Sequence, residues 1–318
     1  MSQQRVYGPN GLTTSPLCFG TMQFGGRASE AQSAEMYAAC REAGINFFDT
    51  AWVYTEGRSE DILGRLIAPE RDDIILVTKA GAEGGCSPKN IRSQLEQSLT
   101  RMKLDYTDIF FLHRFDDDVP LEDTYKEVHA LKQEGKFHHL GVSNYAAWQI
   151  MKAQGLAKAH GFPEIEILQP MYNLVKRQAE VEILPMAEAE NIGVISYSPL
   201  GGGLLTGKYA SNAPSDEAGR LGWDPKYTAR YAQDWMHQAA ANLQLIGSEF
   251  GYDPIALAVA WVAAHSGITA PIISARTADQ LRPSLGAMDV KMDDALYAAL
   301  SALVPTPPPA TDRLEEQS

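Results

Sequence analysis

Short apolar runs alternate with longer amphipathic stretches along most of the chain from residue 15 onward. The runs are almost continuously apolar, which is typical of parallel strands that are covered on both faces. Between the runs, apolar residues recur at helical spacing. The pattern therefore predicts eight strands, over residues 17–20, 46–48, 74–77, 108–112, 140–142, 165–168, 193–197 and 271–273.

Three of the predicted helices have recognisable start signals. Ser29 and Gln32 form a capping-box pattern, and Gly44 follows as a stop signal. Ser87-Pro88 offers an N-cap and a proline at the first helical position. Val119-Pro120 opens a further helix. Each of these helices follows one predicted strand and precedes the next.

Eight strand–helix periods favour a closed (β/α)₈ TIM barrel of the α/β class, as a single domain over residues 1–318. The alternative, an open doubly wound sheet, usually carries G-x-G-x-x-G after its first strand, and residues 20–26 do not match. Residues 200–230, after the seventh strand, are too long for an ordinary connection and are expected to cover cofactor and substrate. Residues 305–318 are expected to form a flexible tail.

Composition narrows the classes of partner. The chain has 45% hydrophobic and 21% charged residues and a formal net charge of -13. This charge argues against nucleic acid or an anionic membrane as the main partner, because both require basic surface. The 3 cysteines are too sparse for a disulfide framework. No run approaches the ~18 apolar residues of a membrane span. We expect a cytoplasmic protein, monomeric or homo-oligomeric.

Ionisable side chains stand at or just beyond the ends of three predicted strands. Asp49 and Tyr54 follow one strand, Lys79 the next, and His113 the one after that. A free phenol has a pKa near ~10, and a nearby ammonium lowers it. We expect Lys79, held charged by Asp49, to lower the pKa of Tyr54 so that the phenol can protonate a carbonyl oxygen oriented by His113. The set predicts carbonyl reduction. Any one of these residues alone would more often be structural.

Motifs of one known family recur in order through the sequence. They comprise Gly20-Thr21-Met22, Phe48-Asp49-Thr50-Ala51, Gly57-Arg58-Ser59-Glu60, Leu63-Gly64, Val77-Thr78-Lys79, Leu112-His113, Gly141-Val142-Ser143-Asn144, Leu168-Gln169-Pro170, Tyr172-Asn173 and Ser196-Tyr197-Ser198-Pro199-Leu200. With these motifs the chain resembles the aldo-keto reductase family over nearly its whole length. The resemblance implies a (β/α)₈ barrel and a catalytic tetrad of Asp49, Tyr54, Lys79 and His113. It also implies hydride transfer from a nicotinamide cofactor to an aldehyde, ketone or sugar carbonyl. The reverse reaction, oxidation of the alcohol, can also be catalysed by such a site.

The same resemblance assigns cofactor contacts. Near the nicotinamide and the pyrophosphate these are Gly20, Thr21, Met22, Asp49, Ser143, Asn144, Gln169, Tyr197, Ser198, Leu200, Gly202 and Lys208. At the adenosine 2′-phosphate they are Ser274, Arg276 and Gln280, with Thr277 nearby. Arg276 can pair with that phosphate, so NADP(H) is expected in preference to NAD(H). Gln280 stands where some members have an adenine-covering arginine, Ser284 where asparagine is common, and Pro283 where a polar contact often lies.

The substrate pocket is less defined by the sequence. Besides Tyr54 and His113, we expect Phe24, Trp52, Arg114 and Trp223 to line it, together with Tyr227. Each of these also fits plain packing or a solvated charge. A mixed aromatic and polar pocket suits aldehydes, ketones and sugar-like carbonyls equally well.

Three other functions are weighed against reduction. A nicotinamide-sensing regulatory subunit is the main alternative, because potassium-channel β subunits resemble this family and keep its tetrad. An aldolase would require an uncharged Lys79. An ATPase would require a P-loop. Residues 202–208 nearly form one, but Tyr209 stands where a serine or threonine would hold Mg²⁺. No metal site is expected, since His138 and His139 should point to opposite faces of a strand.

Overall fold

The computed structural model describes residues 4–209 and 219–316. Eight strands form a closed barrel in the order β10-β3-β4-β5-β6-β7-β8-β9, and each neighbouring pair is parallel. The strands are β3 (Cys18–Gly20), β4 (Phe47–Asp49), β5 (Ile75–Ala80), β6 (Thr107–Leu112), β7 (Phe137–Ser143), β8 (Ile165–Gln169), β9 (Gly193–Ser196) and β10 (Ala270–Ile273). Each overlaps one of the eight predicted runs, so the predicted (β/α)₈ barrel is confirmed.

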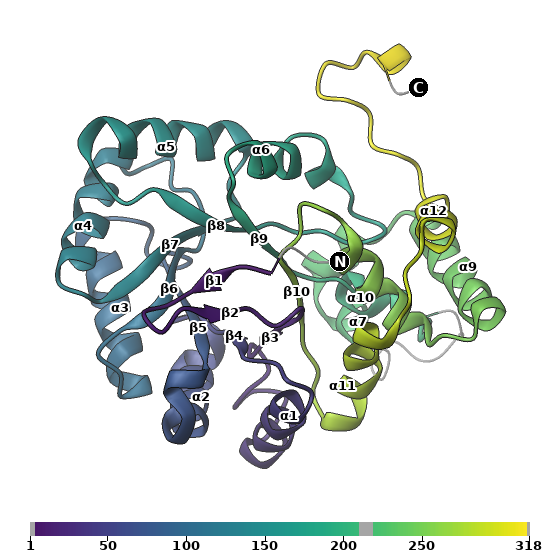
Figure 1. Ribbon diagram of the computed structural model, residues 1–318, viewed down its shortest axis with the longest axis horizontal. Helices are drawn as coiled ribbons and strands as arrows, with labels where there is room; N and C mark the ends of the chain where they lie inside the picture. The colour runs from purple at the N-terminus through teal and green to yellow at the C-terminus, as the bar shows by residue number, and fades with distance from the viewer. Residues whose placement is uncertain (1–3, 210–218, 317–318) are drawn as a thin grey trace.

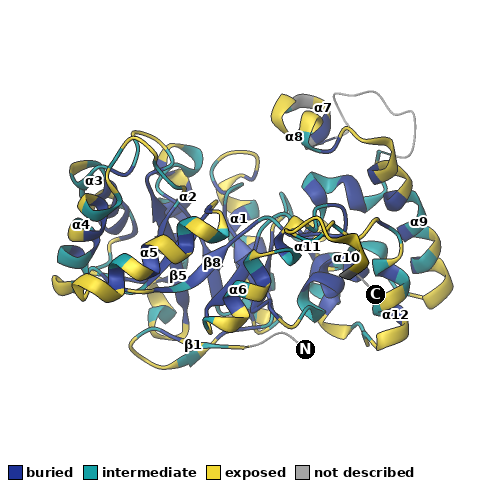
Figure 2. Ribbon diagram, turned by 90° about the horizontal axis from the view of Figure 1, so that it is seen from above, coloured by how far each residue is buried: buried dark blue, intermediate teal, exposed yellow. Residues whose placement is uncertain are grey.

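Helices surround this barrel, with their buried faces toward it and their exposed faces outward (Figure 2). They are α1 (Glu30–Glu42), α2 (Arg58–Ile67), α3 (Pro88–Met102), α4 (Leu121–Gln133), α5 (Ala147–His160), α6 (Ile183–Ala189), α9 (Asp234–Phe250), α10 (Pro254–Ala264), α11 (Ala278–Leu285) and α12 (Asp294–Ser301). The predicted capping box of α1 is present, with Ser29 and Gln32 exchanging hydrogen bonds. The predicted start of α4 at Val119-Pro120 is also present, with Pro120 as the N-cap.

The period-two alternation of the strands explains why the polar residues meet at one end. Ile75 and Val77 belong to the apolar cluster that fills the barrel, and the next residue on that face is Lys79. Ile109 and Phe111 of β6 precede His113 in the same way. A Cβ on Gly141 would lie 2.6 Å from the Phe111 ring, so this glycine makes room for the ring inside the barrel. The filled interior therefore ends in a polar layer at the carboxyl ends of the strands.

A hairpin that the sequence pattern did not reveal covers the other end of the barrel, at the amino ends of the strands. Its strands, β1 (Val6–Tyr7) and β2 (Leu12–Thr13), pair antiparallel and lie across the middle of the barrel (Figure 1). Gly8 donates its amide to Nε2 of His139 at 3.1 Å. The Tyr7 ring packs against Phe47, at the start of β4. Strands of two residues are too short to show an alternation, which is why the pattern missed them.

The segment at residues 200–230 contains short helical pieces in its described part. These are the 3-10 turn η4 (Gly201–Thr206) and the helices α7 (Arg220–Trp223) and α8 (Pro225–Arg230). Figure 2 shows α7 and α8 at the end of the molecule opposite β1. After α12 the chain runs away from the body of the molecule (Figure 1), and residues 311–315 are exposed. Among the described residues, no helix has the length and apolar character required to cross a membrane.

Candidate active site

Asp49, Tyr54, Lys79 and His113 come together at the carboxyl ends of β4, β5 and β6. The Lys79 ammonium donates to Oδ2 of Asp49 at 2.7 Å and to the Tyr54 hydroxyl at 3.3 Å. The His113 ring lies edge-on to the Tyr54 ring, with 6.0 Å between the ring centroids. The four side chains that the sequence analysis grouped therefore form one contiguous polar cluster.

The lysine–carboxylate pair at the base of the cluster is sealed from solvent. Asp49 is 2% exposed and Lys79 is 1% exposed. Gln169 donates to the other Asp49 oxygen at 2.7 Å, and the ammonium also donates to the Thr50 carbonyl at 2.7 Å. Burial alone would lower the pKa of Lys79, but Asp49 and Tyr54 outweigh it and raise the pKa. A charged ammonium cannot form a Schiff base, so the aldolase alternative loses its basis.

Tyr54 differs from the expectation in the direction of its pKa shift. Burial raises the pKa of the phenol, and this effect outweighs the lowering by the Lys79 ammonium. The sequence could place the lysine beside the tyrosine but could not weigh burial against charge. The phenol is accordingly protonated at neutral pH, the form that can donate a proton.

His113 is held neutral. Burial, with the charges of Lys79 and Arg114, lowers the pKa of its imidazole to about 3. Its Nδ1 is buried without a hydrogen-bond partner among the described residues. A neutral imidazole at this place can donate one hydrogen bond without adding a charge to the cluster.

This shift predicts a pH effect on stability. An unfolded histidine titrates near 6.5, so between about pH 6 and 4 the unfolded chain binds a proton at His113 that the folded protein does not. The stabilising contribution is present above about pH 6.5 and is lost as the pH falls toward 3. His113→Gln should flatten the pH dependence of the unfolding free energy by up to about 1.4 kcal/mol per pH unit. Urea unfolding at several pH values measures this, and parallel curves for the two proteins would contradict it.

Residues from β7, β8 and β9 form a second network beside the cluster. Asn144 donates from its amide to the His113 carbonyl and to the Ser143 hydroxyl, both at 3.0 Å. Its Oδ1 accepts from the Tyr197 hydroxyl at 2.8 Å, and Ser143 donates to the Gln169 carbonyl. Asn144 has a φ of 58°, a left-handed conformation that asparagine tolerates better than most residues. Three predicted nicotinamide contacts and the predicted stacking tyrosine are thus hydrogen-bonded to one another or to their immediate neighbours.

Gly20 ends β3, and Thr21 and Met22 follow it, on the other side of Asp49. The Thr21 amide donates to the Asp49 carbonyl at 2.9 Å. Its hydroxyl is buried and shares a 2.8 Å hydrogen bond with Ser59, so the Thr21 side chain is engaged within the protein. A Cβ on Gly20 would lie 2.8 Å from the Ile272 side chain. These residues hold the chain close to the cluster.

The glycine turn at η4 brings backbone and cations together. Gly202 and Gly203 have φ values of 66° and 96°, and Ser198 just before them has 60°. A Cβ on Gly203 would lie 2.8 Å from Nζ of Lys208. Burial and the nearby Arg276 guanidinium both lower the pKa of Lys208. Two cations therefore lie beside a turn whose backbone can approach an anion closely.

Arg276 stands between β10 and α11. It is half-buried, and no carboxylate pairs with it among the described residues. Its amide donates to Oε1 of Gln280 at 3.4 Å, and Thr277 caps α11 by accepting from the Gln280 amide. Ser274, directly after β10, is exposed. Pro283 and Ser284 lie within α11, with Ser284 buried.

The family of the chain follows from comparison with known proteins. The family model described as Aldo/keto reductase family matches residues 16–305. The chain belongs to the aldo/keto reductase family. It is 32% identical to the uncharacterized oxidoreductase YrpG of Bacillus subtilis (strain 168), over 94% of this chain and 95% of that one. It is 33% identical to a probable voltage-gated potassium channel subunit beta of Oryza sativa subsp. japonica, over 91% of this chain and 92% of that one. It is 32% identical to aflatoxin B1 aldehyde reductase member 2 of Rattus norvegicus, over 91% of this chain and 85% of that one.

The residues predicted to line the substrate pocket lie in different environments. Trp52 is half-buried next to the cluster, and its indole donates to Gln97 at 3.2 Å. Arg114 is exposed beside His113 and has no ion pair among the described residues. Phe24 is fully buried and packs on Phe19, with ring centroids 5.7 Å apart, so its ring belongs to the core. The Trp223 side chain lies outside what the structure describes.

Sequence reasoning missed Arg230 of this aldo/keto reductase. Its guanidinium lies over the Tyr227 ring, 4.7 Å from the centroid. Burial raises the pKa of Tyr197 to about 12, and Arg230 is close enough to oppose that rise. A Cβ on Gly202 would lie 2.6 Å from the Tyr227 ring, so α8 contacts the glycine turn. The spacing of three residues from Tyr227 on one helix was the available signal.

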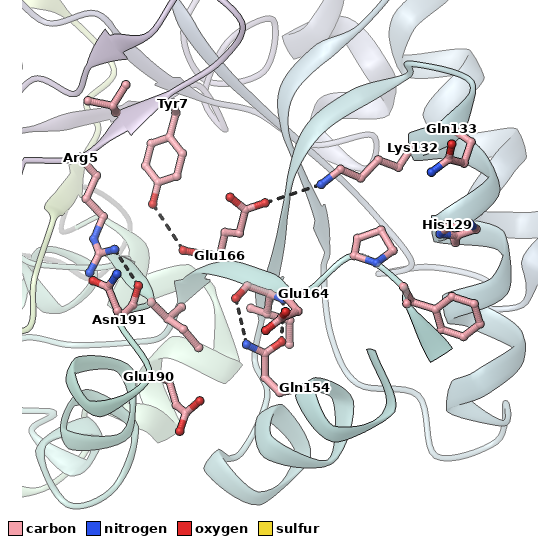
Figure 3. Close-up of a pocket in the computed structure, with 16 residues that line it drawn as sticks. Arg5, Tyr7, His129, Lys132, Gln133, Gln154, Glu164, Glu166, Glu190 and Asn191 are labelled. Carbon is pink, nitrogen blue, oxygen red and sulfur yellow. Dashed lines mark hydrogen bonds and ion pairs between the residues drawn. The ribbon is translucent and has the colours of Figure 1, made fainter. Parts of the chain in front are cut away.

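A hollow of about 730 Å³ opens at the hairpin end of this aldo/keto reductase (Figure 3). Several of its polar side chains already have partners within the protein. Arg5 donates to the Asn191 carbonyl at 2.8 Å, Lys132 lies 3.7 Å from Glu166, and Gln154 bonds the backbone of Ile165. Barrel enzymes carry out their chemistry at the carboxyl ends of the strands, and this hollow is at the other end. The polar cluster around Tyr54 is therefore the candidate active site.

Proposed function

We propose that the protein is an NADP-dependent carbonyl reductase that acts on aldehydes, ketones or sugar carbonyls, and that it can run the reverse alcohol oxidation. The observation that carries the proposal is the 3.3 Å contact between the Tyr54 hydroxyl and a Lys79 ammonium that Asp49 holds charged. A protonated phenol beside a fixed positive charge is suited to give its proton to an oxygen that gains negative charge. The cytoplasm, where NADPH is available, is the proposed location.

Each residue of the cluster has a proposed part in the reaction. Tyr54 gives the proton during reduction and takes it back during oxidation. Lys79 stabilises the phenolate that remains, and Asp49 keeps Lys79 charged and in place. Neutral His113 donates a hydrogen bond to the substrate oxygen and orients it. A nicotinamide held by this site would supply the hydride for the carbonyl carbon.

The residues present fit a nicotinamide dinucleotide. The buried Nδ1 of His113 has no partner among the described residues, and Gly202 and Gly203 carry no side chains of their own at the turn where an anion would approach. Lys208 and Arg276 supply positive charge beside that turn. Ser143, Asn144 and Gln169 are proposed to hold the carboxamide and Tyr197 to stack on the ring, while α8 is proposed to cover the bound cofactor.

Preference for NADPH is proposed to depend on Arg276. Arg276→Ala should weaken the binding of NADPH about tenfold to a hundredfold, because a charge-assisted hydrogen bond to the 2′-phosphate is lost. The affinity for NADH should be nearly unchanged. Arg282→Ala is the matched control, since Arg282 lies in α11 but is 74% exposed and pairs with Asp279 at 3.4 Å. Equal losses for both cofactors would place the 2′-phosphate elsewhere.

Titration of the purified protein with NADPH and with NADH, followed by quenching of tryptophan fluorescence, tests the proposal. Selective binding of NADPH, followed by NADPH oxidation with at least one carbonyl substrate from a screen, is the expected result. Binding of NADH alone would agree with the proposed chemistry, but Arg276 would then have a role other than binding the 2′-phosphate. Failure to bind either cofactor would remove the hydride source and with it the proposed function.

A nicotinamide-sensing regulatory subunit is the second candidate. It is favoured by the 33% identity to plant proteins described as probable voltage-gated potassium channel subunit beta, over 91% of this chain. The two functions differ in turnover. Very slow reduction of every carbonyl tested, by a protein that still binds NADPH tightly, would favour the regulatory subunit.

A further inference from the structure

A second ion pair, whose carboxylate is buried, lies directly behind the turn that carries Tyr54. Glu60, in the first turn of α2, is fully buried, and its Oε2 accepts a hydrogen bond from Nη1 of Arg101 at 3.0 Å. Its Oε1 accepts from the Thr78 hydroxyl at 2.6 Å, and Thr78 precedes Lys79 in β5. One buried carboxylate therefore joins the strand that carries Lys79 to the last turn of α3.

The Arg101 guanidinium also supports the turn itself. Its Nη1 donates to the Trp52 carbonyl at 3.0 Å, and the group lies over the Trp52 ring, 5.4 Å from the centroid. The Trp52 amide in turn donates to the Lys79 carbonyl at 3.1 Å. A Cβ on Gly57 would lie 2.5 Å from Cζ of Arg101, so the guanidinium fills the space under the turn.

The backbone of this turn requires such support. Thr55, Glu56 and Gly57, which follow Tyr54 directly, have φ values of 49°, 60° and 90°. Consecutive left-handed residues are unfavourable for side chains other than glycine, and they persist where the surroundings hold them. Lys79 contacts the turn from the barrel side, through the Tyr54 hydroxyl, and Arg101 contacts it from the helix side.

We infer that Arg101, together with Glu60, is a positioning pair that sets the place of the Tyr54 hydroxyl against Lys79. The inference rests on the proposed reductase function, which gives Tyr54 the proton transfer. Lysine would keep the charge opposite Glu60 but would lose the planar guanidinium that reaches the Trp52 carbonyl and stacks on its ring. A displacement of about 1 Å in a reacting group can lower turnover about a hundredfold.

The test compares Arg101→Lys with Arg92→Ala. Arg92 is a matched control because it lies in the same helix, has a side-chain exposure of 31% against 27% for Arg101, and pairs with Glu127 and Glu134 away from the turn. Arg101→Lys is expected to lower kcat for carbonyl reduction about tenfold to a hundredfold while NADPH binds as before. The solvent deuterium isotope effect on kcat should rise, and added guanidinium should partly restore kcat in Arg101→Ala.

Hydrogen exchange of the amides at residues 51–57 separates this inference from the proposed function. Faster exchange there in Arg101→Lys, and not in Arg92→Ala, supports the positioning role whether or not a carbonyl substrate has been found. Exchange as slow as in the wild-type protein overturns it. So does a loss of kcat in Arg101→Lys no larger than in Arg92→Ala. Absence of carbonyl reduction by the wild-type protein counts against the proposed function, and the exchange result still decides the positioning role.

Discussion

Tyr54→Phe is expected to lower the rate of carbonyl reduction by about two to four orders of magnitude, the usual contribution of a positioned proton donor. The phenol is protonated at neutral pH, since burial raises its pKa more than Lys79 lowers it, and phenylalanine keeps the ring but has no proton to give. NADPH should bind as before, because the variant removes one hydroxyl and no proposed cofactor contact. Single-turnover kinetics and a fluorescence titration measure the two quantities separately.

Tyr106→Phe is the matched control for this change. Tyr106 is half-buried like Tyr54, but it packs against His138 and Arg71 beside the start of β6, far from the site. Removal of its hydroxyl should leave turnover unchanged. If Tyr54→Phe reduced carbonyls at the rate of this control, Tyr54 would not be the proton donor.

Lys79→Met should abolish turnover and also destabilise the fold. It leaves Asp49 buried without its cation, and loss of one partner from a buried ion pair typically lowers the free energy of unfolding by about 3–5 kcal/mol. Since whole proteins are stable by only about 5–15 kcal/mol, the loss is measurable by urea unfolding. The pKa of Lys79 is raised, so the stability that its proton contributes is fully present below the ordinary lysine pKa and is lost as the pH rises past the shifted pKa.

A double variant separates stability from chemistry. Replacement of a buried ion pair by two apolar side chains is often close to neutral, so Lys79→Met with Asp49→Leu should recover part of the lost stability and none of the turnover. Lys126→Met, which breaks an exposed pair with Glu122, should change neither property. Recovery of turnover in the double variant would show that Lys79 acts only through the fold.

The sequence predicted the barrel and its polar end because both have local signals, an apolar run for each strand and a polar residue at or just beyond its end. Each strand repeats an inward-facing apolar residue every second position, and the next inward position after Ile75 and Val77 is Lys79. The same continuation leads to Asp49 in β4 and to Gln169 in β8. Once an apolar run is recognised as a strand, a period of two thus gives the face that its last residue occupies.

What the sequence could not predict depends on distances through space. The direction of the Tyr54 pKa shift follows from the balance of burial and charge, which only the packed structure provides. Arg101 reaches the Tyr54 turn from a helix whose sequence pattern shows an ordinary exposed arginine. Phe24 follows the first barrel strand as a pocket residue would, but the chain turns there and buries it.

The amino-terminal hairpin has a consequence for the order of folding. Its hydrogen bonds reach partners 131 and 186 residues away, at His139 and Asn191, and Asn46 donates to the Thr13 carbonyl. His139 lies in β7, while Asn46 and Asn191 lie just before β4 and β9, so closure of the barrel brings the three partners to one end, and loop closure must precede such contacts. The hairpin therefore docks late. Protection of the Gly8 amide from exchange would report completion of the barrel, at the end of the molecule farthest from the chemistry.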